Sequence, residues 1–383
     1  MIESPILETD FPLATAGDIA VINLESARLQ SWSKFWQSPQ RAGVAEYIVE
    51  QEQMALQFLS DVTALDRLEA LVERLVHLGA EPIRTALIQA QVASTAHRFA
   101  EARSCLQRAR VHGPLPAAAD RLLLSIDQAC GERLDSILKT RQEMAESGRL
   151  EDLVPLGALL ADLRKFDEAD RAYERALREY HDVSPFALAW VCFQLGVLWG
   201  ELAPEGQPSR AAQWYRRALE YVPDYVKARV HLAEIYLRDE KPGDAEALLV
   251  PALSSGDPEV DWRLGDVMIA NENCAEGEAH LQAARSGFEA LLEKHLLAFA
   301  DHGAEFYSGS GDDPDRAFEL ARVNLANRPT LRAFEQTYET AVRSASSKAA
   351  REILAASKKH WGATTAFGQS SLSVCHTASL KND

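Results

Sequence analysis

The chain has 383 residues, of which 47% are hydrophobic and 25% are charged. Its 40 Lys and Arg residues stand against 57 Asp and Glu residues, so the formal net charge is −17. The hydrophobic share is large enough to form a core and excludes a wholly disordered chain. The excess of negative charge disfavours unspecific binding to nucleic acid or to an anionic membrane, since both need a positive field on the protein.

The N-terminal sequence and the spacing of the cysteines indicate in which cellular compartment we expect the protein. The first ten residues carry three acidic and no basic side chains, which is unlike a secretory signal peptide. No segment reaches the roughly 18–20 uninterrupted apolar residues that a membrane-spanning helix needs. The five cysteines are scattered and lack CxxC spacing, so they favour neither a disulfide framework nor a zinc ribbon. We therefore expect a cytoplasmic protein with reduced thiols, no cofactor, and no nucleic-acid or membrane partner.

Residues 1–40 are expected to form an N-terminal extension with a short aromatic helix. The sequence SWSKFWQ at residues 31–37 places Trp32, Phe35 and Trp36 close together. These rings fit two interpretations, an exposed docking patch for a partner or a helix packed on the first repeat.

Amphipathic helices then follow one another in pairs, and no strand alternation is seen. The apolar spacing predicts a pair at residues 43–59 and 63–78, a degenerate pair at 117–128 and 132–147, and a last pair at 331–343 and 346–359. A polar second helix in the last pair suits the end of a stacked array, since no further repeat covers it.

One spacing of small residues recurs through the middle of the chain. In the clearest unit, Gly157 is followed by Ala169, then by Tyr173 and Ala176. The same spacing recurs, in one case with a longer turn, at Gly196, Ala211, Tyr215 and Ala218; at Ala233, Ala245, Leu249 and Ala252; at Gly265, Gly277, Leu281 and Ala284; and at Ala90, Ala102, Leu106 and Ala109, and its second half returns at Ala317, Ala321 and Asn324. Small residues let two helix backbones approach, and the larger Tyr or Leu fills the groove between them.

This pattern resembles the tetratricopeptide repeat, a helix–turn–helix unit of about 34 residues. The resemblance covers roughly residues 83–329, although the family's Trp near the start of the first helix is absent, with Leu153 and Cys192 at the equivalent places. It implies an all-α fold, a right-handed superhelical solenoid of about nine antiparallel helix pairs. We assign the solenoid to residues 41–360 and a flexible tail rich in Ser, Thr and Gly to residues 361–383.

The resemblance also implies a concave groove, lined by the first helix of each repeat, in which a partner peptide binds. The family's groove positions correspond to Trp190, Phe193, Gln194, Lys227, His231, Glu234, Arg238, Trp262, Arg263 and Asp266, together with less central positions upstream. The basic members of this set, flanked by two Trp residues, form a basic–aromatic strip that suits an acidic or carboxylate-bearing peptide. The carboxylate clamp of the chaperone-binding members is not reproduced, because Pro155 and Gln194 stand where its two Asn residues would be.

Signatures of catalysis are sparse. The sequence has no phosphate-binding GxxxxGK[ST] loop, no GxGxxG after a strand and no HExxH motif. His295 and His302 are seven residues apart, with Asp301 beside the second, so they fit either a metal site on one helical face or ordinary histidines. Cys375 next to His376 fits either a reactive thiol or an inert tail cysteine. The acidic residues at 312–315 are expected to cap the following helix.

These features together predict an adaptor or assembly scaffold that binds a protein or peptide partner in the groove. A peptide- or ligand-sensing regulator and an accessory subunit of an enzyme complex are the alternatives. An enzymatic activity is not expected, and the oligomeric state stays open.

Overall fold

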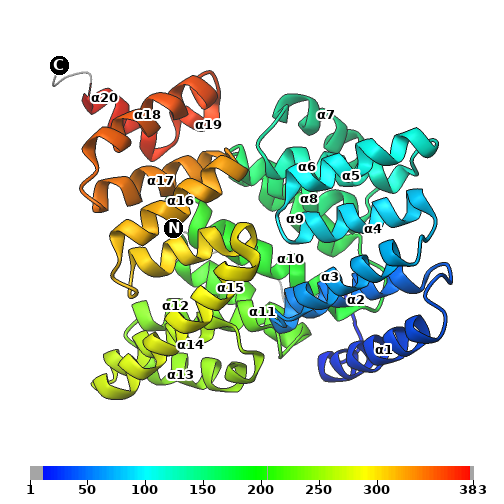
Figure 1. Cartoon of the computed structure of the whole chain (residues 1–383). Coiled ribbons are helices and arrows are strands. Elements are labelled where there is room, and N and C mark those ends of the chain that lie inside the picture. Colours follow the sequence, from blue (N-terminus) through cyan, green and yellow to red (C-terminus); the bar gives the residue numbers. More distant parts are fainter. Residues whose placement is uncertain (1–11, 205, 380–383) are drawn as a thin grey trace. The chain divides into compact units, whose positions relative to one another are not determined.

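Every regular element that the structure describes is a helix (Figure 1). The structure, a computed structural model, describes residues 12–204 and 206–379, with side chains as far as residue 375. The predicted all-α class is therefore confirmed. The chain divides into two compact units, unit 1 with residues 1–23 and 135–228 and unit 2 with residues 24–134 and 229–383. The array expected over residues 41–360 includes residues of both units.

Unit 1 contains the start of α1 (Gly17–Gln37), almost all of α7 (Leu134–Ala145) and the first residues of α12 (Val226–Arg238). Between them lie α8 (Leu150–Asp162), α9 (Phe166–Arg178), α10 (Pro185–Val197) with a π-helical turn (Leu198–Leu202), and α11 (Pro208–Tyr221). The helices α8 and α9 form one packed pair, and α10 and α11 form the next.

Unit 2 contains the remainder of α1 and α12 and two long stretches of helix. The first stretch comprises α2 (Val44–Leu59), α3 (Ala64–His77), α4 (Pro82–Thr95), α5 (Phe99–Ala109) with a 3-10 turn (Arg110–His112), and α6 (Ala117–Ala129). The second comprises α13 (Pro242–Leu249) with a 3-10 turn (Val250–Ser255), α14 (Pro258–Ala270), α15 (Cys274–Ser308), α16 (Pro314–Asn327), α17 (Leu331–Arg343), α18 (Ser347–Trp361), α19 (Thr365–Gly368) and α20 (Ser371–Ser379).

Close approach of the two helices in a pair explains the recurring small residues. A Cβ atom on Gly157 would lie 2.6 Å from the ring of Tyr173, and one on Gly196 would lie 2.3 Å from the ring of Tyr215. At Gly265 the same atom would lie 2.8 Å from Leu281. The large residue of each unit therefore occupies the space that the missing side chain leaves, as the spacing predicts.

The turns between paired helices share a feature that the sequence did not reveal. Five residues before the small residue of the second helix, the backbone is left-handed at His97, Arg164, Glu240, Glu272 and Ala345, with φ between 55° and 63°. The next N–H group then bonds back across the turn, as from Arg98 to the carbonyl of Ala93 at 2.7 Å. This is a Schellman ending, and it occurs here without the glycine that usually marks it.

The two stretches of unit 2 meet although they are far apart in sequence. On one side, Asp66 of α3 accepts hydrogen bonds from Lys294 at 2.8 Å and His295 at 2.9 Å, both on α15. Further along, the side chain of Asn327 donates to the carbonyl of His97 at 2.9 Å. Unit 2 is therefore held together by contacts between helices that a simple linear stack would leave apart.

The segments outside the repeats are packed. In α1, Phe35 is fully buried and the indole of Trp32 donates to Glu52 at 2.7 Å, whereas Trp36 stays 60% exposed. Residues 361–375 form no free tail, because Phe367 and Leu372 are buried in one apolar cluster with Trp361. Ser- and Thr-rich composition had suggested a flexible segment, but its few apolar residues are spaced to reach that cluster.

Residues 185–202, which cover α10 and its π-helical turn, are long and apolar enough in composition to cross a membrane, with a mean hydropathy of 1.3. Some 61% of this stretch is buried inside the protein. Its apolar side chains are therefore used in packing unit 1.

We predict that Gly196→Ala destabilises the protein. The added Cβ would overlap the ring of Tyr215, and overpacking of this kind costs about 1–3 kcal/mol of stability. This cost exceeds the stability gained from the higher helix propensity of Ala. Gly243→Ala, in the first turn of α13 with no atom within 4 Å of the new Cβ, is the matched control. Thermal unfolding of both variants by circular dichroism measures the difference. Equal melting temperatures for the two variants would contradict the packing described here.

Candidate functional site

The predicted groove residues are divided between the two units. Trp190, Phe193 and Gln194 on α10 and Lys227 on α12 belong to unit 1, whereas His231, Glu234, Arg238, Trp262, Arg263 and Asp266 belong to unit 2. Phe193 is only 7% exposed, and its ring centroid lies 5.6 Å from that of Tyr215 and 5.1 Å from that of Tyr225. Phe193 is thus a core residue of unit 1.

In unit 2, two of the side chains expected to anchor an acidic peptide are engaged within the protein. Arg263 of α14 stacks on the ring of Trp262 at 3.5 Å and forms ion pairs with Glu234 of α12 and, at 3.5 Å, with Glu305 of α15. Trp262 is 2% exposed, and its indole N–H donates to Ser310 at 3.0 Å. The guanidinium therefore already has two carboxylate partners, and the indole offers little surface to a ligand.

Asp266 lies on the same side of α14 and accepts a hydrogen bond of 2.6 Å from the hydroxyl of Ser310. Burial raises the pKa of Asp266, and the bond from Ser310 offsets part of this effect. Trp262, Ser310 and Asp266 thus form a hydrogen-bonded chain between α14 and the turn after α15.

A second pair of ionisable side chains, Glu259 and His302, joins α14 to α15. The Nδ1 atom of His302 lies 2.6 Å from a carboxylate oxygen of Glu259. Burial by itself would raise the pKa of Glu259, but the charge of His302 and the hydrogen bond to it lower that pKa to about 2. Glu259 is therefore ionised throughout the physiological range.

The network continues to α16 and to the turn before α5. Arg328 forms an ion pair with Asp301, and together with His302 it holds the pKa of Asp301 well below its usual range despite burial. Nearby, burial and the positive charge of Arg328 lower the pKa of His97 to about 4. His97 is consequently neutral in the folded protein at neutral pH.

These residues form paired groups on α12, α14, α15 and the end of α16 in unit 2, and we call the set the acidic strip. It consists of Glu234, Glu259, Arg263, Asp266, Asp301, His302, Glu305 and Arg328. Carboxylates outnumber guanidinium groups in this set. Glu305 is the most accessible member, with 60% of its side chain exposed.

The predicted groove set contained Glu234 and Asp266 but missed the other carboxylates of this strip, Glu259, Asp301 and Glu305. Glu259 precedes Arg263 by four residues and Asp301 precedes Glu305 by four, so each pair shares a helix face. That spacing is the signal that could have revealed them.

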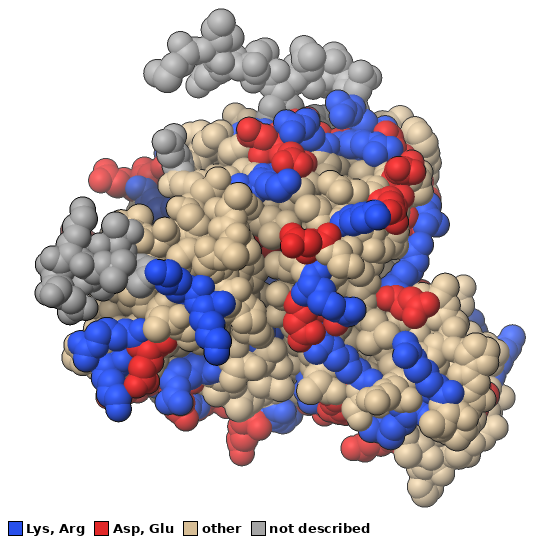
Figure 2. Space-filling model, turned by 90° about the horizontal axis from the view of Figure 1, so that it is seen from above, with Lys and Arg blue, Asp and Glu red and all other residues tan. Residues whose placement is uncertain are grey.

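Figure 2 shows Lys and Arg mixed with Asp and Glu over the face that it draws, with no broad positive area there.

The two histidines considered as metal ligands do not share a face. The helix α15 departs from helical geometry at His295, with φ −131° and ψ 49°. His295 is buried against Asp66, with Glu69 at 3.7 Å, whereas His302 contacts Glu259. Among the residues that the structure describes, no group of three or more His, Cys, Asp or Glu side chains could hold a metal ion.

The remaining candidates are also placed. Cys375 is partly buried against the C-terminal apolar cluster, and the side chain of His376 lies outside the described residues. In the acidic loop, Asp313 caps α16 by accepting the N–H of Arg316 at 3.0 Å, as expected.

Comparison with known proteins agrees with the repeat pattern. Residues 202–255 match the family model of the tetratricopeptide repeat. No curated protein matches the sequence.

Several solved structures are similar over long stretches. The C-terminal part of a TPR repeat-containing protein from Cytophaga hutchinsonii has 14% identity and a TM-score of 0.37, over 64% of this chain and 97% of that one. The APC/C hetero-tetramer Cut9-Hcn1 gives 12% identity and a TM-score of 0.46, over 90% of this chain and 65% of that one. An IFIT1 monomeric mutant with m7Gppp-AAAA gives 16% identity and a TM-score of 0.43, over 93% and 85%.

We predict that His97 makes the protein sensitive to mild acid. The unfolded chain binds a proton on this histidine near its ordinary pKa of 6.5 and the folded chain only near about 4, so stability is present above pH 6.5 and is lost as the pH falls toward 4. The loss amounts to at most about 1.4 kcal/mol per pH unit. His97→Asn keeps a residue that tolerates the left-handed backbone and removes the titration.

Urea unfolding at pH 7 and at pH 5 measures this effect. The stability of the wild type should fall more between these pH values than that of His97→Asn. Parallel losses in the two proteins would show that His97 is not buried in its neutral form.

Proposed function

We propose that this tetratricopeptide-repeat protein is a protein-interaction scaffold that binds a basic segment of a partner protein along the acidic strip. The observation that carries the proposal is the excess of carboxylates over guanidinium groups among the paired side chains of α12, α14 and α15, with Glu305 60% exposed.

The strip suits binding because its side chains are already held in place. Glu234 and Glu305 are fixed by Arg263, Glu259 by His302, and Asp301 by Arg328. Side chains that are ordered before a partner arrives lose little conformational entropy when it docks. Ion pairs at the edge of such a surface also guide the approach of an oppositely charged segment.

The sign of the charge decides the class of partner. The expectation of an acidic peptide rested on four basic side chains flanked by two Trp residues, and two members of that set, Arg263 and Trp262, are engaged inside unit 2. Arg238, at the end of α12, is the exposed cation of the predicted set, whereas Glu305 is an exposed carboxylate beside Arg263. Because the carboxylates of the strip outnumber its guanidinium groups and Glu305 is its most exposed side chain, a segment rich in Lys or Arg fits the strip better than an acidic one.

We predict that Glu305→Lys weakens partner binding and that Arg238→Glu does not. Exchanging an attractive surface charge for a repulsive one changes the affinity by about three- to tenfold. The measurement is affinity capture from a lysate of the native host by the tagged full chain, quantified by mass spectrometry, followed by titration of the captured partner. Glu240→Lys, on the exposed turn before α13, controls for net charge.

Two results would contradict the prediction that the partner segment is basic and binds the acidic strip. Loss of the partner with Arg238→Glu, and its retention with Glu305→Lys, would mean that the partner is acidic. Equal capture by all variants would remove the strip as the binding surface.

A further inference from the structure

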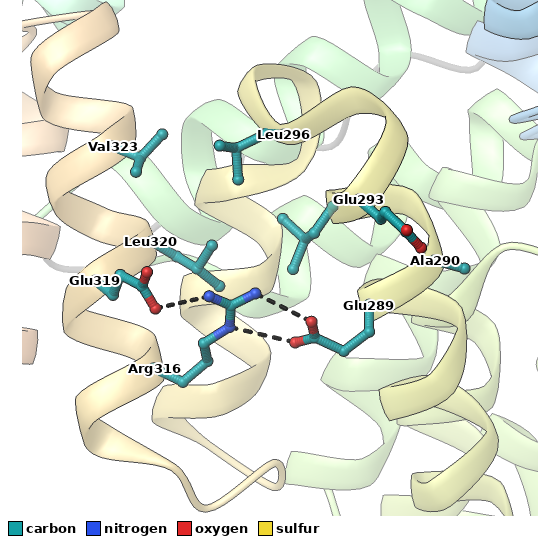
Figure 3. A pocket seen from close by; sticks show the side chains of 9 residues that line it. Glu289, Ala290, Glu293, Leu296, Arg316, Glu319, Leu320 and Val323 are labelled. Carbon is teal, nitrogen blue, oxygen red and sulfur yellow. Dashed lines mark hydrogen bonds and ion pairs between the residues drawn. The ribbon is translucent and has the colours of Figure 1, made fainter.

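A hollow of about 580 Å³ opens between α15 and α16 in unit 2 (Figure 3). Its floor is formed by Leu292, which is 3% exposed, and Leu320, which is 1% exposed. Above the floor stand Leu296, which is 39% exposed, and Val323. A partner protein that binds in this open hollow can bury these apolar side chains and so remove them from water.

The rim of the hollow is acidic. Glu289, Glu293 and Glu319 surround it, and Arg316 is the cation among its lining residues. Figure 3 shows the guanidinium of Arg316 between two of these carboxylates, at 3.0 Å from Glu289 and 2.6 Å from Glu319. Arg316 is thus neutralised from both sides, and the lining keeps an excess of negative charge.

Glu289 is held in its charged form. It also accepts a hydrogen bond of 2.6 Å from the hydroxyl of Tyr307. Burial tends to raise the pKa of Glu289, but the hydrogen bonds from Tyr307 and Arg316 outweigh it and lower that pKa. The rim therefore stays negative at neutral pH.

We propose that this hollow docks an amphipathic basic helix of a partner protein. Apolar side chains of that helix, one turn apart, would lie against Leu296, Leu320 and Val323. Lys or Arg residues beside them would reach Glu293 and Glu319. Recognition of a helix through an apolar stripe in a groove, with charges setting its orientation, is an established mode of peptide binding.

This site is separate from the acidic strip. It uses mainly the part of α15 that precedes the break at His295, together with Leu296 directly after the break, whereas the strip uses residues 301–305 further along. The proposal does not depend on the proposed function of the strip, and each can fail alone.

Charge also excludes the chain's own N-terminus as the occupant. Residues 1–11, MIESPILETDF, contain three acidic side chains and no Lys or Arg. A second copy of the chain carries a net charge of −17 and would be repelled over long distances, although the exposed cations Lys358 and Lys359 of α18 could present a basic helix. Self-association is therefore a separate outcome of the test.

The test uses the full chain and a labelled 14-residue peptide of Leu and Lys, with Leu on one helical face, and a matched peptide of Leu and Glu. Fluorescence anisotropy measures binding to the wild type, to Glu293→Lys/Glu319→Lys, and to the control Glu240→Lys/Glu278→Lys, which has the same net charge. Circular dichroism checks that all variants are helical.

We expect the Leu/Lys peptide to bind the wild type and the control alike, and the rim variant about tenfold more weakly. Leu296→Ala, which removes apolar surface without changing charge, should weaken binding about threefold. Hydrogen exchange should show protection by the peptide at residues 289–296 and 314–323. The Leu/Glu peptide should not bind.

Three results would overturn the proposal. Equal weakening by the rim and control variants would mean attraction to net charge alone. Weakening by Glu305→Lys, with none by the rim variant, would place the peptide on the acidic strip and leave only the proposed function standing. A dimer in sedimentation that the rim variant abolishes would assign the hollow to a second copy of the chain.

Discussion

The pairing of His295 with α3 is the contact on which the candidate surfaces of unit 2 depend. His295 is buried, with Asp66 at 2.9 Å and Glu69 at 3.7 Å, and α15 breaks its helical geometry at this residue. A side chain that leaves the helix face to reach a distant carboxylate gives the backbone a reason to bend there. Because the two partners lie 229 residues apart in sequence, the same contact joins the N-terminal and C-terminal stretches of unit 2.

The two parts of α15, before and after the break at His295, contribute mainly to different surfaces. Residues before it pack as a second helix against α14 and form most of one wall of the acidic hollow, with Leu292 at its floor. Leu296, directly after the break, completes that wall. Residues after it behave as the first helix of the next repeat and carry Asp301 and Glu305 into the acidic strip. A straight α15 could not place both sets of carboxylates as they are. One local irregularity thus determines where two interaction surfaces can lie.

The sequence was sufficient to predict how the paired helices pack, but not which charged side chains pair with one another. Gly157 and Tyr173, or Gly196 and Tyr215, contact each other within one repeat, so their spacing alone predicts their packing. The partners of Arg263 come from two other helices, so no spacing along the chain indicates whether that cation is available to a ligand. The left-handed turns were also hidden, because His97 and Glu240 stand where glycine would have been the signal.

The joining of the two stretches of unit 2 is tested most directly by a disulfide. The sulfur of Cys130, after α6, lies 3.9 Å from the carbonyl oxygen of Asn327 at the end of α16. In Asn327→Cys, mild oxidation should link Cys130 to the new cysteine, and mass spectrometry without reduction should find the joined peptides. Glu240→Cys should give no link to Cys130. If both thiols of Asn327→Cys instead stay free and react separately with a maleimide, α6 and α16 do not meet and the account of unit 2 is contradicted.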